Sequence, residues 1–424
     1  MRRKYYLDWL RVIALGLLIL YHTGCLYAPW PYNLKSPHPL PQIEWALLAL
    51  NPWRLALLFL ISGVACRYLI AKLGPGGLAL DRVRRLVPVL LFAMTVVIPP
   101  QTYVELLSKG LTRESYPQFW LFSYLGADQR LVAPLHKTMP TYDHLWFVAY
   151  LLVYSLIYAG AAALWARRGE AWRRAPAADA PRRLPLWLLI VGPAIWLIAS
   201  LLVIDRWFPQ TGWLGDDWGA HLKWGGLFVT GVLLAGRDDF WAWARRRRRE
   251  LAVAALAGLG LQVADHAWWL TGRQDPHWSS LLWSGASGAF AWATILALIG
   301  LAAQRLDRPS PALSYLNAAI LPVYVLHQPI LLVSAYFLFP LGLPWPEEAG
   351  LLIAITLLGA LAIYELAIRR FGLMRFLFGL KPLSQREKDR TSVQRPAAAS
   401  QSAERISCRR EAVRSNSNDP SPSG

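Results

Sequence analysis

Charged residues are scarce in this chain. They make up 17% of its 424 residues, whereas a typical soluble protein has about 25%. Apolar residues (AVILMFWYC) reach 55%, which is more than one or two cores of ordinary size can bury. This balance excludes a disordered chain, a coiled coil and a collagen-like fibre, and it argues against an ordinary soluble protein. The class that remains is a polytopic, all-α membrane protein.

Cysteine is nearly absent. The three cysteines, Cys25, Cys66 and Cys408, have a spacing that fits no metal-binding motif. Cys408 lies in a polar tail, which argues against a disulfide framework. We therefore expect no metal and no permanently bound cofactor.

Acidic residues are also few. The 26 Asp and Glu are outnumbered by 44 Lys and Arg, which gives a formal net charge of +18. In a soluble protein this excess would indicate nucleic-acid binding. Here the basic residues gather between long apolar runs, as at residues 245–249, and such clusters are typical of the cytoplasmic loops of membrane proteins. We expect the lipid bilayer, and no nucleic acid, as a partner.

About ten apolar runs are long enough to cross a bilayer, which takes about 20 helical residues. With the N-terminus in the cytoplasm, ten spans place most of the 44 Lys and Arg on the cytoplasmic side, as the positive-inside rule requires. Both termini are therefore expected in the cytoplasm. The expected spans are residues 7–27, 51–71, 86–106, 145–165, 184–204, 219–236, 251–271, 281–303, 318–339 and 349–368.

The composition also divides the chain into two parts. Residues 1–380 are expected to form one transmembrane domain, and residues 381–424, rich in Ser, Arg, Pro, Ala and Glu, a disordered basic cytoplasmic tail. The longest expected outer loop, residues 107–143, is too short for a catalytic domain. A functional site must therefore lie among the helices.

Three polar residues, Asp8, Arg11 and His22, interrupt the first span. A helix turns 100° per residue, so all three share one stripe, with Arg11 and His22 about 16 Å apart along the axis. Charges inside a span are costly and mark functional sites. We interpret the stripe as a polar track with a cationic anchor at one end and a base at the other, because histidine titrates near neutral pH. The alternative is an interfacial Asp8–Arg11 pair and a hydrogen bond from His22 to another helix.

An arginine pair, Arg82 and Arg85, precedes the third span. Residues three apart share a helical face, and two guanidinium groups can bind the oxygens of a polyphosphate bidentately. The alternative is ordinary positive charge that sets the topology.

Further histidines lie in or beside other spans. His144 opens the fourth span, and His327 lies in the ninth, between two prolines that disturb regular helix. Broken helices in membranes line cavities. We expect His22, His144 and His266 in the outer half of the membrane, with His327 deeper, and their convergence indicates a site there.

Several segments of the chain resemble those of a known family. YYLDWLRVIALGLLILYH resembles the first helix of the acyltransferase 3 family of bacterial membrane proteins, whose Arg and His are here Arg11 and His22. A narrower group of the family, the glucans biosynthesis protein C proteins, ends in a segment similar to AIYELAIRRFGLMRFLFGLKP. Further segments extend the resemblance in order: LALLFLISGVACR with Ser62, LDRVRRLVP with Arg82 and Arg85, HLWFVAYLLVYSL with His144 and Trp146, and SYLNAAILPVYVLHQPILL with His327.

The resemblance implies an O-acyltransferase of the bacterial inner membrane. Such proteins move an acyl group, here succinyl or acetyl, from cytoplasmic acyl-CoA to a hydroxyl of a periplasmic or envelope glucan or polysaccharide. It implies that Arg82 and Arg85 bind the phosphates of the donor. His22 would act as the base on the acceptor hydroxyl or carry the acyl group transiently.

The resemblance gives the other residues supporting roles. Arg11 would lie near the thioester, with Asp8 orienting it. A succinyl donor would need a cation in the outer half of the membrane, for which Lys223 and Arg206 are candidates by position. The residues expected to line the cavity or contact the acceptor are Ser62, His144, Trp146 and His327.

A different class also fits a chain of about ten spans. A transporter or flippase for a lipid-linked or envelope sugar would share the intramembrane charges and broken helices. It would not need an arginine pair at a cytoplasmic mouth aligned with an intramembrane base. A non-catalytic scaffold is disfavoured, since it has no use for costly charges within its spans.

Overall fold

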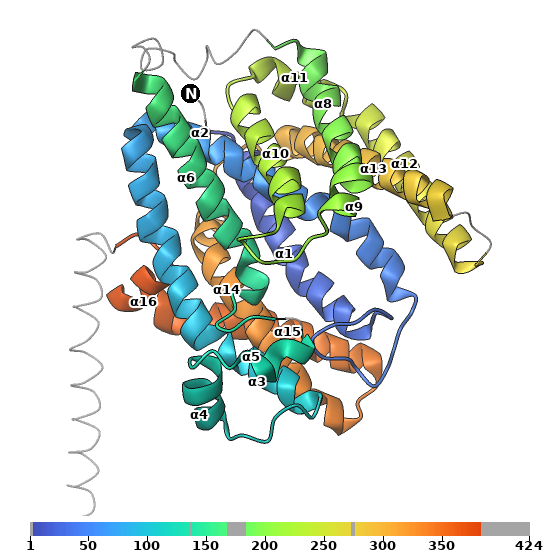
Figure 1. Ribbon diagram of the computed structural model, residues 1–424. Coiled ribbons are helices and arrows are strands. Elements are labelled where there is room, and N and C mark those ends of the chain that lie inside the picture. The colour runs from blue at the N-terminus through green and yellow to red at the C-terminus, as the bar shows by residue number, and fades with distance from the viewer. Residues whose placement is uncertain (1–2, 136, 168–183, 273–275, 383–424) are drawn as a thin grey trace, which may run out of the picture.

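In the computed structural model, residues 3–135, 137–167, 184–272 and 276–382 are described. Every secondary-structure element in these residues is a helix (Figure 1). The all-α class is therefore confirmed. The expected tail, residues 381–424, lies outside the described residues except for its first two.

Nine long helices form the body of the part of the chain that the structure describes. Shorter helices and helical turns connect or extend them: α3 (Pro99–Ser108), α4 (Tyr116–Gln118), α5 (Gln129–Val132), α9 (Asp205–Trp207), α11 (Asp238–Arg246), α16 (Gly372–Leu377), the π-helical segments η1 (Ala93–Val97), η2 (Phe119–Tyr124), η5 (Ser200–Ile204) and η7 (Tyr364–Ile368), and the 3₁₀ turns η3 (Ala133–Leu135), η4 (Asp143–Leu145) and η6 (Phe339–Leu341). The long helices are α1 (Tyr5–Tyr27), α2 (Ile43–Phe92), α6 (Trp146–Arg167), α8 (Leu186–Ala199), α10 (Trp218–Leu234), α12 (Arg248–Leu270), α13 (Pro276–Arg305), α14 (Pro311–Leu338) and α15 (Trp345–Ile363).

Eight helical segments of the described residues are long and apolar enough to cross a membrane, which indicates a multi-pass membrane protein. Each of the ten expected spans overlaps a helix. Two of them, 51–71 and 86–106, share one segment of 66 residues, Ile43–Ser108. The span expected at 219–236 corresponds to α10, whose 17 residues are fewer than the usual 20 or so. The number of spans and the side of each terminus stay predictions.

The chain reverses direction within α2. Gly74 has a φ of 73° and a ψ of 174°, a left-handed conformation that glycine adopts without steric cost. Pro75 follows it and cannot donate a hydrogen bond to the preceding turn. The two halves of α2 then lie side by side, because Arg82 of the second half contacts Cys66 of the first at 3.5 Å. This hairpin places the arginine pair beside the first half of α2.

Helix α1 lies at the centre of the bundle and packs against α2, α13, α14 and α15 (Figure 1). The first half of α2 also crosses α10 closely. A Cβ atom added at Gly63 would lie 2.0 Å from the carbonyl oxygen of Phe228, and one at Gly231 would lie 2.0 Å from that of Leu60. Small residues at such crossings let membrane helices approach each other closely.

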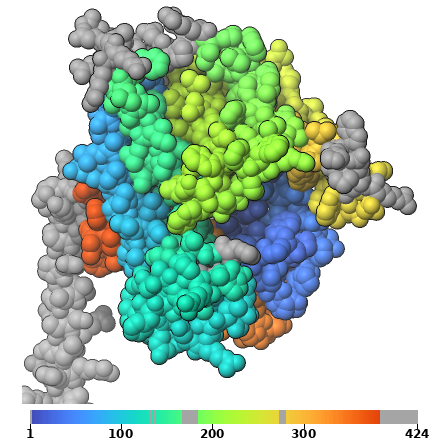
Figure 2. Space-filling view, in the orientation of Figure 1, coloured from blue at the N-terminus to red at the C-terminus, as the bar shows by residue number. Residues whose placement is uncertain are grey.

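A compact lobe forms mainly from the expected longest outer loop, residues 107–143, together with α3, which comes from the end of the expected span 86–106. It contains α3, α4, η2 and α5 and has its own apolar core of Leu106, Phe119, Tyr124 and Met139. Figure 2 shows this lobe at one end of the molecule, and Figure 1 shows the N-terminus at the opposite end. The lobe therefore covers the end at which α6 begins.

Candidate active site

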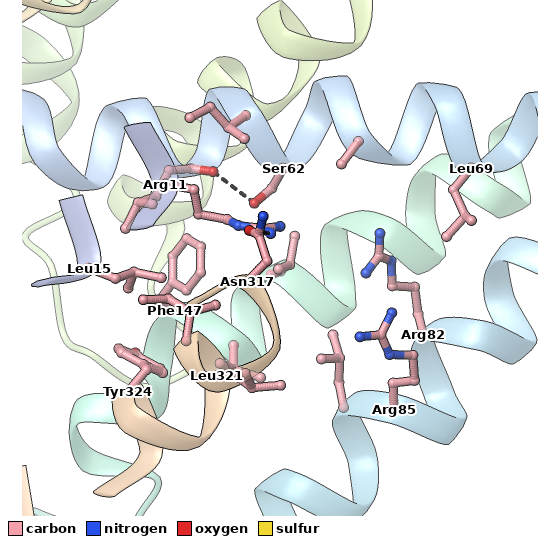
Figure 3. A pocket seen from close by; sticks show the side chains of 17 residues that line it. Arg11, Leu15, Ser62, Leu69, Arg82, Arg85, Phe147, Asn317, Leu321 and Tyr324 are labelled. Atoms are coloured by element: carbon pink, nitrogen blue, oxygen red, sulfur yellow. Dashed lines mark hydrogen bonds between the residues drawn. The ribbon is translucent and has the colours of Figure 1, made fainter. Parts of the chain in front are cut away.

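A cavity of about 320 Å³ lies between α1, both halves of α2, α6 and α14 (Figure 3). It brings together four residues that the sequence singled out: Arg11, Ser62, Arg82 and Arg85. None of its lining residues is acidic. The lining is otherwise apolar apart from Asn317 and Tyr324 of α14. A cavity with three guanidinium groups and no carboxylate is suited to an anionic ligand with an apolar extension.

The two arginines of the second half of α2 hold their guanidinium groups inside this cavity. Arg82 donates to the sulfur of Cys66 at 3.5 Å, which is a weak acceptor, and its Nε is buried without a partner. Arg85 donates from Nε to the carbonyl of Gly379 at 3.2 Å. Figure 3 shows both side chains extending from one helix toward Arg11. Both keep donors for a ligand, whereas their neighbour Arg84 is exposed.

Arg11 is held from two sides. Its Nη2 lies 3.6 Å from Asp8 Oδ1 and donates to Asn317 Oδ1 at 2.5 Å. The three-residue spacing of Asp8 and Arg11 thus gives the expected pair, and Asp8 also accepts from Arg3 at 2.7 Å. Asn317 is a site residue that the sequence analysis does not identify. Ser62 Oγ donates to the carbonyl of Leu58 at 2.7 Å, so its hydroxyl is already occupied as a donor.

Three histidines form a cluster beyond the cavity. The ring centroids of His22 and His327 are 5.3 Å apart, and those of His327 and His144 are also 5.3 Å apart. His266 does not join them. It lies 3.4 Å from Glu44, because α12 packs along α13, away from the cluster. The expectation that His266 converges with His22 and His144 is wrong, whereas His327, a site candidate from the sequence, contacts both of them.

The hydrogen bonds of two of these rings fix their tautomers. His327 Nδ1 lies 2.6 Å from the carbonyl of Tyr324, and His144 Nε2 lies 3.1 Å from that of Val325. A carbonyl only accepts, so both nitrogens carry the hydrogen. In the neutral rings, His327 Nε2 and His144 Nδ1 are then acceptors, and both are buried without a partner. The cluster therefore offers acceptors to hydroxyl groups of a ligand.

His22 is oriented by a residue from the loop after α1. Its Nδ1 lies 2.8 Å from the hydroxyl of Tyr32, and the two rings are stacked with centroids 6.0 Å apart. If Nδ1 donates to the tyrosine oxygen, Nε2 keeps the lone pair that a base requires. Tyr32 carries no signal in the sequence, because an irregular loop has no periodicity from which to place its side chains.

Tyr324 joins the cavity to the histidine cluster. Its side chain lines the cavity, its hydroxyl donates to the carbonyl of His144 at 2.5 Å, and its ring stacks on His327 at 5.7 Å. The three histidines and Trp146 are not among the lining residues. Trp146 packs instead in an aromatic group with Phe59, Tyr150 and Trp224.

A further cation lies beside the histidines. Arg54 is 1% exposed, and its guanidinium lies 4.0 Å from the centre of the Tyr21 ring. It is one helical turn from Leu58, which lines the cavity. Arg54 was not among the predicted site residues, since its place near the start of the expected span 51–71 makes it resemble a charge in a loop.

An ion-pair cluster closes the end covered by the lobe. Lys137 lies 2.6 Å from Glu105 Oε2 and 2.9 Å from Asp143 Oδ2. Burial lowers the pKa of Lys137, but the two carboxylates outweigh burial and raise this pKa above its ordinary value. Asp143 has a φ of 38°, a strained conformation for a residue other than glycine. Its ion pair and a hydrogen bond from Gln328 at 3.3 Å hold the turn that presents His144.

Comparison with known proteins gives the class to which these features belong. The acyltransferase domain of the acyltransferase 3 family matches residues 4–365, so the chain belongs to this family and is an acyltransferase. The match includes every candidate site residue described above.

Proteins from Salmonella are among those similar to this chain. Glucans biosynthesis protein C of Salmonella typhimurium is 24% identical over 409 residues, which cover 92% of this chain and 98% of that protein. Proteins of the same name from Salmonella paratyphi A and Salmonella agona are 24% identical over 405 residues, which cover 91% of this chain and 97% of each relative. No solved structure matches the chain. The name of these relatives refers to glucan biosynthesis.

Proposed function

We propose that this protein transfers a succinyl or acetyl group from cytoplasmic acyl-CoA to a hydroxyl of a periplasmic or envelope glucan, from a site in the bacterial inner membrane. The observation that carries the proposal is the arrangement of two groups. Three arginines line one cavity, and three histidines cluster directly beyond Tyr324, which lines the same cavity.

The arginine end suits the donor. Coenzyme A carries several phosphate oxygens, and Arg82 and Arg85 retain unused donors toward the cavity. Guanidinium groups bind phosphate in a bidentate manner. The apolar lining between Arg82 and Arg11 suits the extended arm that ends in the thioester. Arg11, fixed by Asp8 and Asn317, would then lie near the thioester carbonyl.

The histidine end suits a hydroxyl acceptor. A sugar hydroxyl can donate to the free nitrogens of His144 and His327 and approach His22. His22 Nε2 takes the proton as the hydroxyl oxygen attacks the thioester carbonyl carbon. The new C–O bond forms, the C–S bond breaks, and the departing thiolate takes the proton from the imidazolium. The alternative path begins with attack by His22 itself, which gives an acyl-histidine that the hydroxyl then resolves.

The test is direct measurement of transfer by the purified full-length protein in lipid nanodiscs. Succinyl-CoA or acetyl-CoA is supplied with periplasmic glucan. A thiol reagent measures the release of free CoA, and mass spectrometry measures the molecular mass of the glucan. We expect CoA release that depends on the glucan, and a mass gain of one succinyl or acetyl ester per transfer. Absence of acyl-CoA consumption with glucan, lipopolysaccharide sugar and exported polysaccharide alike would refute the proposal.

A further inference from the structure

Arg54 is a buried cation that has no counter-ion among the residues the structure describes. Its side chain is 1% exposed, and its Nε and Nη1 are buried without a hydrogen-bond partner. The groups that act on it electrostatically are Tyr21 and Cys25, neither of which is an anion at neutral pH. A buried charge is normally paired, because removing an ion from water is costly. This arginine therefore lacks the partner that its burial requires.

The contact with Tyr21 compensates only one part of the guanidinium. A cation over an aromatic ring is stabilised through the face of that ring, and the distance of 4.0 Å places Arg54 in this arrangement. The N–H donors lie in the plane of the guanidinium and point away from its faces. The donors on Nε and Nη1 are buried without a partner, and guanidinium donors form strong, charge-assisted hydrogen bonds to carboxylate oxygens.

The position of Arg54 relates this anion site to the reaction centre. Tyr21 packs edge-on against His22, with ring centroids 5.4 Å apart, and Arg54 acts electrostatically on both His22 and His327. The distance between an anionic group at Arg54 and a carbonyl group held at His22 would thus match the length of a short acyl group.

The two cations suggested by sequence position are less suited to this role. Lys223 is already paired with Asp205 at 3.3 Å, and Arg206 is exposed. Arg54 is buried beside the histidine cluster and has no acidic partner among the described residues.

We propose that Arg54 binds the free carboxylate of a dicarboxylic acyl group, and that it is the residue that makes the protein select a succinyl donor over an acetyl donor. This inference rests on the proposed acyl transfer. It adds a specificity-determining residue, because the roles proposed above for the arginine cavity and the histidine cluster do not involve the far end of the acyl group.

The experiment compares two donors of equal chain length on the full-length protein in nanodiscs. Succinyl-CoA carries the carboxylate, and butyryl-CoA has a methyl group in its place. Wild type, Arg54→Gln and Arg54→Lys are assayed for kcat/KM with each donor. Lys223→Gln is the matched control, since it removes a cation that Asp205 already neutralises. Elution from size exclusion and the Tm of each variant verify folding.

We expect Arg54→Gln to lower kcat/KM for succinyl-CoA roughly 10-fold to 100-fold, the range for losing hydrogen bonds to a charged group, and to leave butyryl-CoA within about threefold of wild type. Arg54→Lys keeps the charge and so protects the fold, but it loses the fork and should lower succinyl transfer about 10-fold. Lys223→Gln should keep the wild-type ratio between the donors.

Equal losses on both donors would overturn the proposal, because Arg54 would then act on the shared thioester or on the fold. Unchanged succinyl transfer in both Arg54 variants would overturn it as well. Failure of the proposed function looks different, since wild type itself would then consume neither donor.

Discussion

Replacing His22 with Gln is the sharpest perturbation of the proposed chemistry. Glutamine has a similar length and still forms hydrogen bonds, but its amide is not a base. General-base assistance is typically worth about 10²-fold to 10⁴-fold, so kcat should fall by that factor. His22 is not among the residues that line the arginine cavity. KM for acyl-CoA should therefore stay within about threefold of wild type.

The chain supplies a matched control for this variant. His266 is another partly buried histidine, but it lies beside Glu44 at 3.4 Å, outside the cluster. His266→Gln should transfer acyl groups at the wild-type rate. The assay is the initial rate of CoA release per amount of folded protein, with folding verified by size exclusion. Turnover of His22→Gln within about threefold of wild type would refute the role of His22.

The same assay can separate the two chemical paths. Wild-type protein is incubated with acyl-CoA in the absence of glucan and then digested for mass spectrometry. The acyl-histidine path predicts an added acyl mass on the peptide that contains His22, accompanied by a burst of CoA. The general-base path predicts neither, because no bond forms until the hydroxyl is present. An acyl mass on a different residue would contradict both.

Three further predictions follow from the geometry. Arg82→Ala should raise the Kd of acyl-CoA, measured by titration calorimetry, roughly 10-fold to 100-fold. The control Arg84→Ala removes an exposed neighbour and should leave the Kd unchanged. Equal effects of the two variants would refute the role of Arg82 in binding phosphate. Tyr32→Phe removes the 2.8 Å hydrogen bond between Tyr32 and His22 and should lower kcat about tenfold with KM unchanged; an unchanged kcat would show that the bond has no orienting role. Gly63→Ala places a methyl group 2.0 Å from a carbonyl oxygen of α10 and should destabilise the protein by about 1–3 kcal/mol or more, measured as a lower Tm. The control Gly16→Ala adds a methyl group in open space. Similar Tm values for the two variants would contradict the close crossing of α2 and α10.

Local features of the site could be predicted because they depend on one helix at a time. The pairing of Asp8 with Arg11 follows from the three-residue spacing. The position of Arg82 and Arg85 on one face follows in the same way, and the structure places both in one cavity. The all-α class and the approximate positions of the spans followed from apolar runs of sufficient length.

Contacts between helices were not predictable on the same grounds. Periodicity defines which face of a helix a residue occupies, but not which other helix that face meets. Arg11 meets Asn317, and His22 meets Tyr32 from a loop, and neither partner carries a signal in the sequence. The reversal within α2 had a signal, because glycine and proline are adjacent at residues 74–75.

His266 and His327 show why depth along a span is a poor guide to a site. His266 and His22 both lie near the outer ends of expected spans, which suggested that they meet. The depth of a residue in the membrane gives its position along one axis only, whereas contact between two residues also requires that their helices are neighbours. Helix α14 packs against α1, so its His327 reaches His22, while α12 packs along α13 and carries His266 to Glu44. A polar residue within a span therefore indicates a site only once the neighbour of its helix is known.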